Sequence, residues 1–308
     1  MSKMDNKFTI LSTICDGEEP ESTLCTRTWD IAFLGDPRTD KRSKVACEFV
    51  KQQSNQSYSL RDDNNTLYLD DVQVTRPYLA SLTKNAKSIL VEATTLACPE
   101  LIAIIRASVK QEVRHFSFLY LEPVEYRRKI KGNLTQHRDF DLSENFRFRS
   151  VHGCMNNLAE SLPGQAIFFL GYEKSRLGTA LEQQEMLRKW QKHAVFGVPG
   201  YQAGWEIDAL ANNAHHLSAD RFNIQYVAAD SVNAAYQLLN ALRKADKTEK
   251  PILVCPLGTK PHTIATSLFL VEHNEDQATT LLFDHPKKAS ERSTEVRRWH
   301  IYDVFCSD

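Results

Sequence analysis

The fold is most clearly encoded in the stretch Ile252-Leu253-Val254-Cys255-Pro256-Leu257-Gly258-Thr259-Lys260-Pro261-His262-Thr263. Its first residues, 252–254, are aliphatic and too few for a helix, so they predict a buried strand. Pro261 suits the first turn of a helix, because its fixed φ is already helical. The following apolar run therefore predicts a helix over 262–271, and a strand that leads into a helix through a short loop is typical of a parallel sheet.

The same alternation of short apolar runs and helix-like segments extends in both directions along the chain. We predict strands at 30–34, 66–69, 88–91, 116–121, 166–170, 194–198, 224–227, 280–283 and 299–302, and helices at 43–53, 76–84, 99–111, 177–192, 205–215 and 232–244. This pattern predicts an α/β fold with two Rossmann-like lobes, each a mainly parallel sheet flanked by helices. The expected domains are 1–126 and 165–308, joined by a connecting segment at 127–164.

The two halves repeat similar strand sequences. Ile31-Ala32-Phe33-Leu34-Gly35 resembles Ile167-Phe168-Phe169-Leu170-Gly171, and Lys87-Ser88-Ile89-Leu90-Val91 resembles Lys250-Pro251-Ile252-Leu253-Val254. Two related units would explain the repetition. Convergence is the alternative, because buried parallel strands are generally rich in aliphatic residues.

Composition narrows the possible partners. The 308 residues carry a net charge of −1, which gives no overall attraction to nucleic acid or to an anionic membrane. Basic residues are concentrated locally in 127–149 and 287–298. No apolar stretch reaches the length of a membrane span. The seven cysteines form no CxxC pair, so we expect reduced, mostly buried thiols in a cytoplasmic protein, with no metal site and no identified cofactor.

The loop at 256–263 has the groups that a phosphate requires. In open α/β sheets, ligands bind beyond the carboxyl ends of the strands. Gly258 allows close approach of the backbone, Thr259 and Thr263 offer hydroxyls, and Lys260 adds a charge at the positive end of a helix. The stretch is not a Walker A loop, because GxxxxGK[ST] is absent. It predicts binding of a phosphorylated, nucleotide-type ligand.

Gly258-Thr259-Lys260, at the head of the helix that follows the fourth strand of this half, resembles the second motif of the CRISPR-associated Rossmann-fold (CARF) ligand-sensing domains. The resemblance covers about 165–308. It places the family's first motif at the loop 171–176, with Gly171, Glu173 and Arg176 as further ligand-binding residues. It implies sensing of a signalling nucleotide, a cyclic oligoadenylate in that family, in prokaryotic antiviral defence. Those domains bind their ligand at a dimer interface, so a homodimer is also implied.

The N-terminal half offers a second set of candidates. Gly35 and Arg38 lie in a loop after the first predicted strand, and Glu92, Thr94 and Thr95 follow the strand at 88–91. Glu92 could be the acid/base of a nucleotide-processing enzyme that cleaves or transfers N-glycosidic bonds. Its competing role is structural, as an acceptor of hydrogen bonds from the amides of Thr94 and Thr95. A third alternative is a subunit of a defence complex whose loops contact a protein partner.

Overall fold

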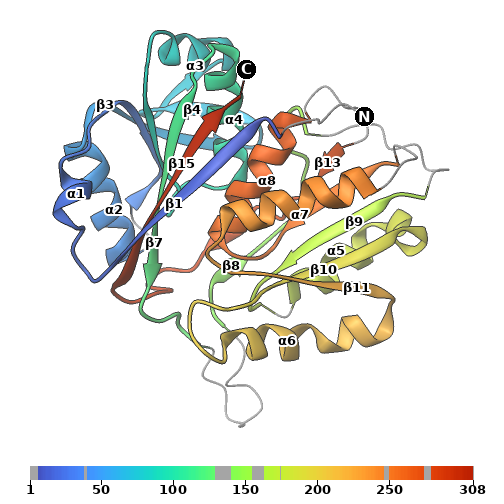
Figure 1. Ribbon diagram of the computed structural model, residues 1–308. Coiled ribbons are helices and arrows are strands. Elements are labelled where there is room, and N and C mark those ends of the chain that lie inside the picture. Colours follow the sequence, from blue (N-terminus) through green and yellow to red (C-terminus); the bar gives the residue numbers. More distant parts are fainter. Residues whose placement is uncertain are drawn as a thin grey trace. The chain divides into compact units, whose positions relative to one another are not determined.

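The computed structural model describes residues 6–37, 40–128, 140–154, 163–173, 175–245, 250–273 and 279–307 (Figure 1). The chain divides into two compact units. Unit 1 comprises Met1–Glu125 and Ser293–Asp308, and unit 2 comprises Tyr126–Arg292. Each contains a large sheet with helices, which confirms the predicted α/β class. The large sheet of unit 2 is wholly parallel, as expected, whereas that of unit 1 has three parallel and four antiparallel strand pairs among the described residues.

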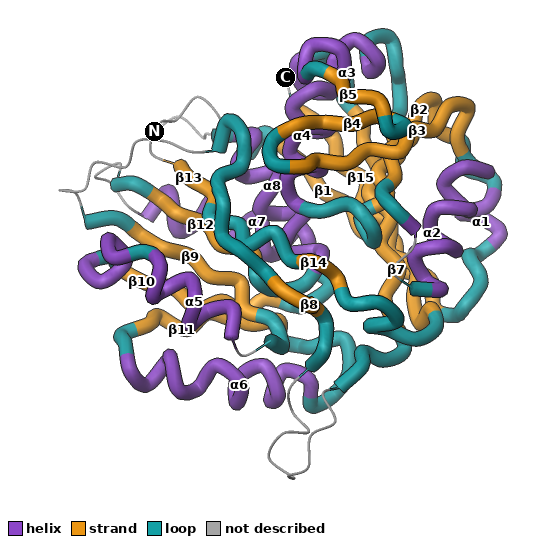
Figure 2. Tube along the Cα trace, turned by 180° about the vertical axis from the view of Figure 1, so that it is seen from behind, coloured by secondary structure: helices purple, strands orange, loops and turns teal. Residues whose placement is uncertain are grey.

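Unit 1 is built on an eight-stranded sheet (Figure 2). In spatial order its strands are β1 (Phe8–Asp16), β15 (Val296–Cys306), β7 (His115–Pro123), β6 (Ile89–Glu92), β2 (Trp29–Leu34), β3 (Ser54–Asp63), β4 (Thr66–Leu69) and β5 (Val72–Val74). The four central strands β7, β6, β2 and β3 run parallel, while both margins are antiparallel. Pairs of left-handed residues, Asn64-Asn65 and Asp70-Asp71, make the tight turns between β3, β4 and β5.

The last strand corrects the expected domain boundaries. β15 pairs with β7 on one side and with β1 on the other, so 293–308 belongs to unit 1 and not to the domain expected at 165–308. The expected connecting segment 127–164 falls within unit 2, where β8 (Ser143–Asn145) pairs with β14 (Lys287–Lys288). The apolar pattern at 299–302 predicted a strand correctly, but periodicity carries no information on which sheet a strand joins.

The helices of unit 1 begin where side chains can satisfy their first amides. They are α1 (Ser22–Cys25), α2 (Lys41–Gln52), α3 (Arg76–Thr83) and α4 (Cys98–Lys110). Asp40 caps α2 by accepting from the Ser43 amide at 2.7 Å, and Thr75 caps α3 by accepting from Tyr78. Pro77 and Pro99 stand in the first turns of α3 and α4, as their fixed φ predicts.

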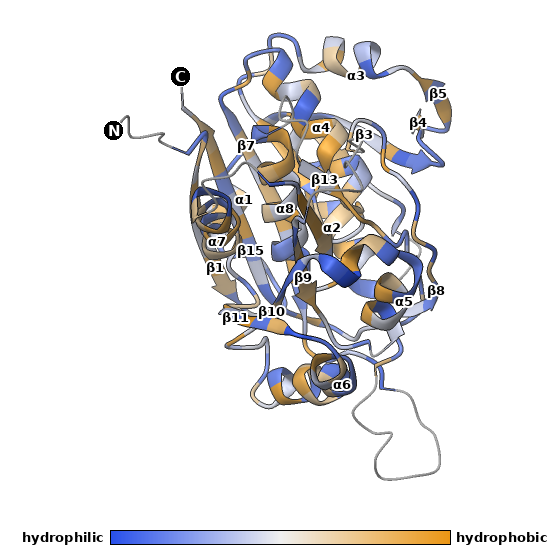
Figure 3. Cartoon of the chain, turned by 90° about the vertical axis from the view of Figure 1, so that its right-hand side faces the viewer, coloured by the Kyte–Doolittle hydropathy of each residue, from blue (hydrophilic) through white to orange (hydrophobic). Residues whose placement is uncertain are grey.

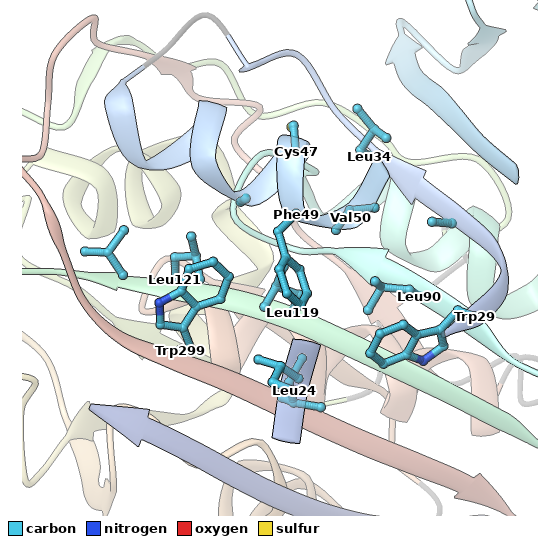
Figure 4. Close-up of a cluster of buried hydrophobic side chains, with 14 of the residues drawn as sticks. Leu24, Trp29, Leu34, Cys47, Phe49, Val50, Leu90, Leu119, Leu121 and Trp299 are labelled. Atoms are coloured by element: carbon cyan, nitrogen blue, oxygen red, sulfur yellow. The ribbon is translucent and has the colours of Figure 1, made fainter. Parts of the chain in front are cut away.

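The apolar face of α2 covers one side of the unit 1 sheet. Figure 4 shows Phe49 and Val50 of this helix beside Leu90, Leu119 and Trp299 of the sheet. The rings of Phe49 and Trp299 meet edge to face, with centroids 5.1 Å apart. Burial of such side chains is the main stabilising term of the unit, at about 1.5–3 kcal/mol for each large apolar residue.

Unit 2 is built on a five-stranded, wholly parallel sheet. Its order is β11 (Phe222–Val227), β10 (Gln191–Gly197), β9 (Gln165–Leu170), β12 (Ile252–Pro256) and β13 (Thr279–Leu281). The connecting helices are α5 (Ser175–Gln183), α6 (Trp205–Ala219), α7 (Val232–Ala245) and α8 (Lys260–Glu272). Along α5 and α6, hydrophilic and hydrophobic residues interleave, as expected of helices with one buried face (Figure 3). Numbered along the chain, the strand order 3-2-1-4-5 is that of a Rossmann-type unit.

One predicted helix was too long. The helix expected over 177–192 ends at Gln183 in the structure, where it gives way to the short 3₁₀ helix η3 (Glu185–Lys189). Gln191 already pairs with Gln165 as the first residue of β10. The charged and apolar residues after Gln183 follow a helical pattern, but pairing of β10 with the central strand β9 overrides it.

The similar sequences of the two halves form the central strand pair of each unit. β2 lies beside β6, and β9 lies beside β12. The pairing register nevertheless differs. Ile31 is opposite Ile89 in unit 1, whereas the corresponding Ile167 is opposite Val254, two residues further along β12. A shift of two residues keeps every side chain on the same face of the sheet.

Other expectations concern thiols and membrane spans. All seven cysteines are free, and five of them are buried. Within the described ranges, none of the helices combines the length and the apolar character that crossing a bilayer requires. The same residues contain no group of three side chains suited to holding a metal ion.

Candidate functional site

Most of the predicted ligand-binding residues of unit 2 gather at one point of its sheet. After β9 the chain adds β10 and β11 on one side of β9, and then crosses back to add β12 and β13 on its other side. The sheet therefore has its topological switch point between β9 and β12. The carboxyl ends of these strands lead to Gly171 and Gly258. This is the position where open α/β sheets bind ligands.

The loops after β9 and β12 touch at Gly171. A Cβ atom there would lie 2.6 Å from the Leu257 carbonyl oxygen, so no larger residue fits without moving the backbone. At Gly258 a Cβ would lie 3.1 Å from His262 Nδ1 and 3.3 Å from the Cβ of Phe169. Close packing of the protein with itself therefore requires glycine at 171, whereas at 258 a methyl group would need the neighbouring side chains to move slightly.

The hydroxyls expected to bind phosphate are used within unit 2. Thr259 Oγ1 donates to the Ala229 carbonyl at 2.6 Å, and Thr263 Oγ1 donates to the Thr259 carbonyl at 3.2 Å. Thr259 is the N-cap residue of α8, yet its side chain caps no amide of that helix. The head of α8, with Lys260 as its first and partly exposed residue, thus begins without a side-chain cap from Thr259.

His262, in the first turn of α8, was not predicted. Its ring is completely buried against Phe169, with centroids 4.9 Å apart, and Nε2 contacts the Ala228 carbonyl at 3.1 Å. Nδ1 has no hydrogen-bond partner in the described part of the chain, and it faces Gly258. Burial lowers the pKa of His262 to about 4, although the Ala228 carbonyl and the charge of Asp230 act in the opposite direction. The neutral ring therefore donates from Nε2 and leaves Nδ1 as an acceptor.

The side chains of Arg176 and Glu173 make hydrogen bonds within unit 2 and do not project into solvent from the loop after β9. The Arg176 guanidinium donates to both oxygens of Asp284 and, through Nη1, to the Leu257 carbonyl at 3.0 Å. Burial alone would lower the pKa of Arg176, but the charges of Asp284 and Glu173 outweigh it and raise that pKa. Glu173 also accepts from the amide and hydroxyl of Ser143. These side chains hold the β12 loop in place, which differs from the expected direct contact with a ligand.

The candidates of the N-terminal half gather at the corresponding point of unit 1, between β2 and β6. Glu92 is completely buried and accepts from the amides of Thr94 and Thr95 at 2.7 and 2.9 Å, and from the Thr95 hydroxyl. Thr95 Oγ1 accepts in turn from the Gly35 amide, and Thr94 Oγ1 accepts from the Leu121 amide. Glu92 therefore accepts the hydrogen bonds from Thr94 and Thr95 that its structural role predicts. Arg38 lies outside the described residues.

A serine, a histidine and an aspartate also meet in unit 1, at Ser117, His115 and Asp303. The Asp303 carboxylate accepts from Ser117 Oγ at 2.6 Å and lies 3.1 Å from His115 Nε2. Arg27 donates to the same carboxylate. In a catalytic triad the imidazole stands between the hydroxyl and the carboxylate. Here the hydroxyl donates directly to the carboxylate, so the group is a partly buried polar cluster that links β7, β15 and the residue Arg27.

The two switch points thus differ in the side chains that occupy their backbone amides. In unit 1 the carboxylate of Glu92 occupies the local amides, and Asp40 caps the head of α2. In unit 2 the side chain of the N-cap residue Thr259 caps no amide of α8, and the nearby charge of Asp230 acts on His262 in the first turn. Unit 2 is therefore the better candidate for an anionic ligand. No family model matches this chain, and none of the curated proteins compared with it does.

Proposed function

We propose that unit 2 binds a phosphorylated, nucleotide-type ligand at the head of α8 and acts as a sensor or binding module. The observation that carries this proposal is the start of α8 at the switch point between β9 and β12. The Thr259 side chain turns away from the helix to Ala229. A thirteen-residue helix that begins in this way directs its amides and the positive end of its dipole toward an incoming anion.

His262 favours a ligand that also carries a hydrogen-bond donor, because its Nδ1 is a buried acceptor without a partner among the described residues. An unpartnered buried acceptor costs about 1–3 kcal/mol, so a ligand that brings a donor to Nδ1 gains this free energy on binding. Inorganic phosphate offers only its own hydroxyls as donors. A nucleotide combines an anionic group with hydroxyl and amino donors, and therefore suits both features.

The sequence also favours a nucleotide. Gly258-Thr259-Lys260 resembles the second motif of the CARF domains, which sense signalling nucleotides of antiviral defence. Binding without turnover is the preferred form of the proposal, because Glu92, the expected acid/base, has its carboxylate oxygens occupied by Thr94 and Thr95.

Titration calorimetry of the full chain against linear and cyclic nucleotides tests the proposal. Lys260→Ala removes one charged contact and should weaken binding by about 1.5–3 kcal/mol, roughly ten- to a hundredfold. The exposed Lys250 belongs to the same unit, so Lys250→Ala is the matched control and should bind like the wild type. Equal affinity of the wild type and Lys260→Ala would refute this site. Chromatography of the same mixtures after several hours separates a sensor from an enzyme.

A further inference from the structure

A groove of about 720 Å³ opens at the amino ends of β10 and β11, the opposite sheet edge from the head of α8. It lies between η3, the end of α6 and the first residues of the two strands. Four of its lining residues are cationic and one is acidic, namely Arg188, Lys189, Lys192, Arg221 and Asp220. The whole chain has a net charge of −1, so this positive excess is local.

Among the described residues, only one of the four cationic side chains, that of Lys192, has partners within the protein. The Lys192 ammonium is buried and donates to the carbonyls of Leu187 and Trp190, near the end of η3, and it also pairs with Asp220 at 3.2 Å. Asp220 is further occupied by the amide of Arg221. Lys192 and Asp220 therefore neutralise one another.

The other three cations are exposed and unpaired. In the described part of the chain, the side chains of Arg188, Lys189 and Arg221 have neither a hydrogen bond nor an ion pair. Like charges that converge on a concave surface repel each other and concentrate the field in the groove. An anion with several charges would pair with all three side chains at once.

An apolar face continues from the groove along the edge strand β11, where Phe222 is half-buried and its ring contacts that of Phe168. Lys192 is paired in register with Phe222, so the two side chains lie on the same face of the parallel sheet. Alternation places Ile224 and Tyr226 on that face too, and they are 44% and 58% exposed. The distance from Phe222 to Tyr226 along the strand is roughly 13 Å. Tyr226 does not line the groove, but it lies on the strand that begins there. An exposed aromatic side chain on the same strand as unpaired cations can stack a base while the cations neutralise backbone phosphates.

We infer that this surface, formed by Arg188, Lys189, Arg221, Phe222 and Tyr226, binds single-stranded nucleic acid. Phosphates lie in the groove, and an unstacked base packs on the Tyr226 ring. A duplex fits less well, because its bases are paired and stacked and present no free face to Tyr226. An acidic peptide would satisfy the charges but would leave the apolar face without a matching partner. The site is separate from the one at α8.

Fluorescence anisotropy with a labelled twelve-nucleotide oligo(dT) tests this inference on the full chain. Arg188→Gln/Lys189→Gln/Arg221→Gln should weaken binding at least tenfold. It should also reduce the slope of log K against log salt by about 2, since each phosphate contact on a single strand contributes about 0.7. A control with the same change in charge replaces three exposed lysines of unit 2 outside the groove by Gln, namely Lys244, Lys250 and Lys287. It should stay within twofold of the wild type.

Two further measurements separate stacking and the ligand class. Tyr226→Ala should weaken binding by between about fivefold and a hundredfold, and Tyr226→Phe should retain it, because only the ring is needed. Lys260→Ala should leave the oligonucleotide affinity unchanged, which distinguishes this site from the proposed nucleotide site. Absence of oligo(dT) binding by the wild type would overturn the inference. So would an equal loss in the control variant, or equal affinity for a twelve-base-pair duplex or a twelve-residue poly-Glu peptide. Unchanged unfolding temperatures verify that the variants are folded.

Discussion

Arg176 and Asp284 form a two-point ion pair, in which Nε and Nη2 of the guanidinium lie 2.5 and 2.8 Å from the two carboxylate oxygens. The Asp284 side chain is fully buried and that of Arg176 nearly so. Through its third donor, Arg176 also holds the Leu257 carbonyl. The pair therefore connects the loop after β9 and the loop after β12 to the chain that follows β13.

Asp284→Ala should destabilise unit 2 strongly. Removal of Asp284 leaves the buried Arg176 charge with only the longer ion pair to Glu173, at 3.6 Å. Breaking a buried ion pair in this way typically costs about 3–5 kcal/mol of unfolding free energy. The exposed pair Lys287–Glu144 of the same unit provides the control, and Glu144→Ala should cost less than about 1 kcal/mol. Urea unfolding monitored by circular dichroism measures both values. Similar losses in the two variants would show that the buried pair has no special role.

Glu92→Gln should affect the stability of unit 1 more than any ligand binding by unit 2. All three groups that face the Glu92 carboxylate are donors, and an amide nitrogen in place of one oxygen would meet another donor. We expect a loss of about 1–3 kcal/mol. Glu48→Gln, on the exposed face of α2, should change little. A Glu92→Gln protein with wild-type stability and altered turnover of a nucleotide would instead support the catalytic alternative.

The two glycines of the unit 2 switch point should differ in their tolerance of a methyl group. Gly171→Ala places its Cβ 2.6 Å from a backbone oxygen, whereas Gly258→Ala meets the side chains of His262 and Phe169 at more than 3 Å. Overpacking usually costs about 1–3 kcal/mol, and the cost is greater where backbone must move. We therefore expect Gly171→Ala to lower the denaturant midpoint more than Gly258→Ala. The reverse order would contradict this description of the loops.

Much of the fold was predictable because its strands and helices are locally distinct. The aliphatic run at 252–254 and Pro261 indicated β12 and the start of α8, and the structure has both. The sheet joined by β15 was not predictable, since its partners β1 and β7 are far away in sequence. The end of α5 was also misjudged, because pairing of β10 with β9 overrides the helical pattern after Gln183.

The site was predictable as a location but not as a set of contacts. The rule for parallel sheets selected the loops at Gly171 and Gly258. Which donors remain for a ligand depends on partners remote in sequence, such as Asp284 for Arg176 and Ala229 for Thr259. His262 gave no signal of its own, because its burial and its contacts with Phe169 and Ala228 depend on residues remote in sequence. The basic groove could not be predicted from the sequence, because its cationic residues come from two separate segments, 188–192 and 218–223.

The pH dependence of stability offers a direct test of the buried state of His262. The pKa of His262 is lowered by burial to about 4 in the folded protein, whereas an unfolded histidine titrates near 6.5. Between these values the unfolded state binds more protons. Stability is thus complete above about pH 6.5 and is lost as the pH falls toward 4. The shift corresponds to about 3 kcal/mol, at about 1.4 kcal/mol for each pH unit.

Other histidines act in the same direction, so the comparison must be between variants. Burial also lowers the pKa of His193, whose ring nitrogens lack hydrogen-bond partners among the described residues, and lowers that of His273 to about 4. Urea midpoints from pH 7.5 to 4.5 should therefore fall for the wild type. They should fall less steeply for His262→Gln, by up to about 1.4 kcal/mol for each pH unit. His193→Gln is the matched control for a buried histidine away from the head of α8. NMR titration of the His262 ring in the wild type gives the same answer without a substitution. A measured pKa of 6.5 or above, or parallel pH profiles for the wild type and His262→Gln, would show that His262 is not held neutral in the folded unit.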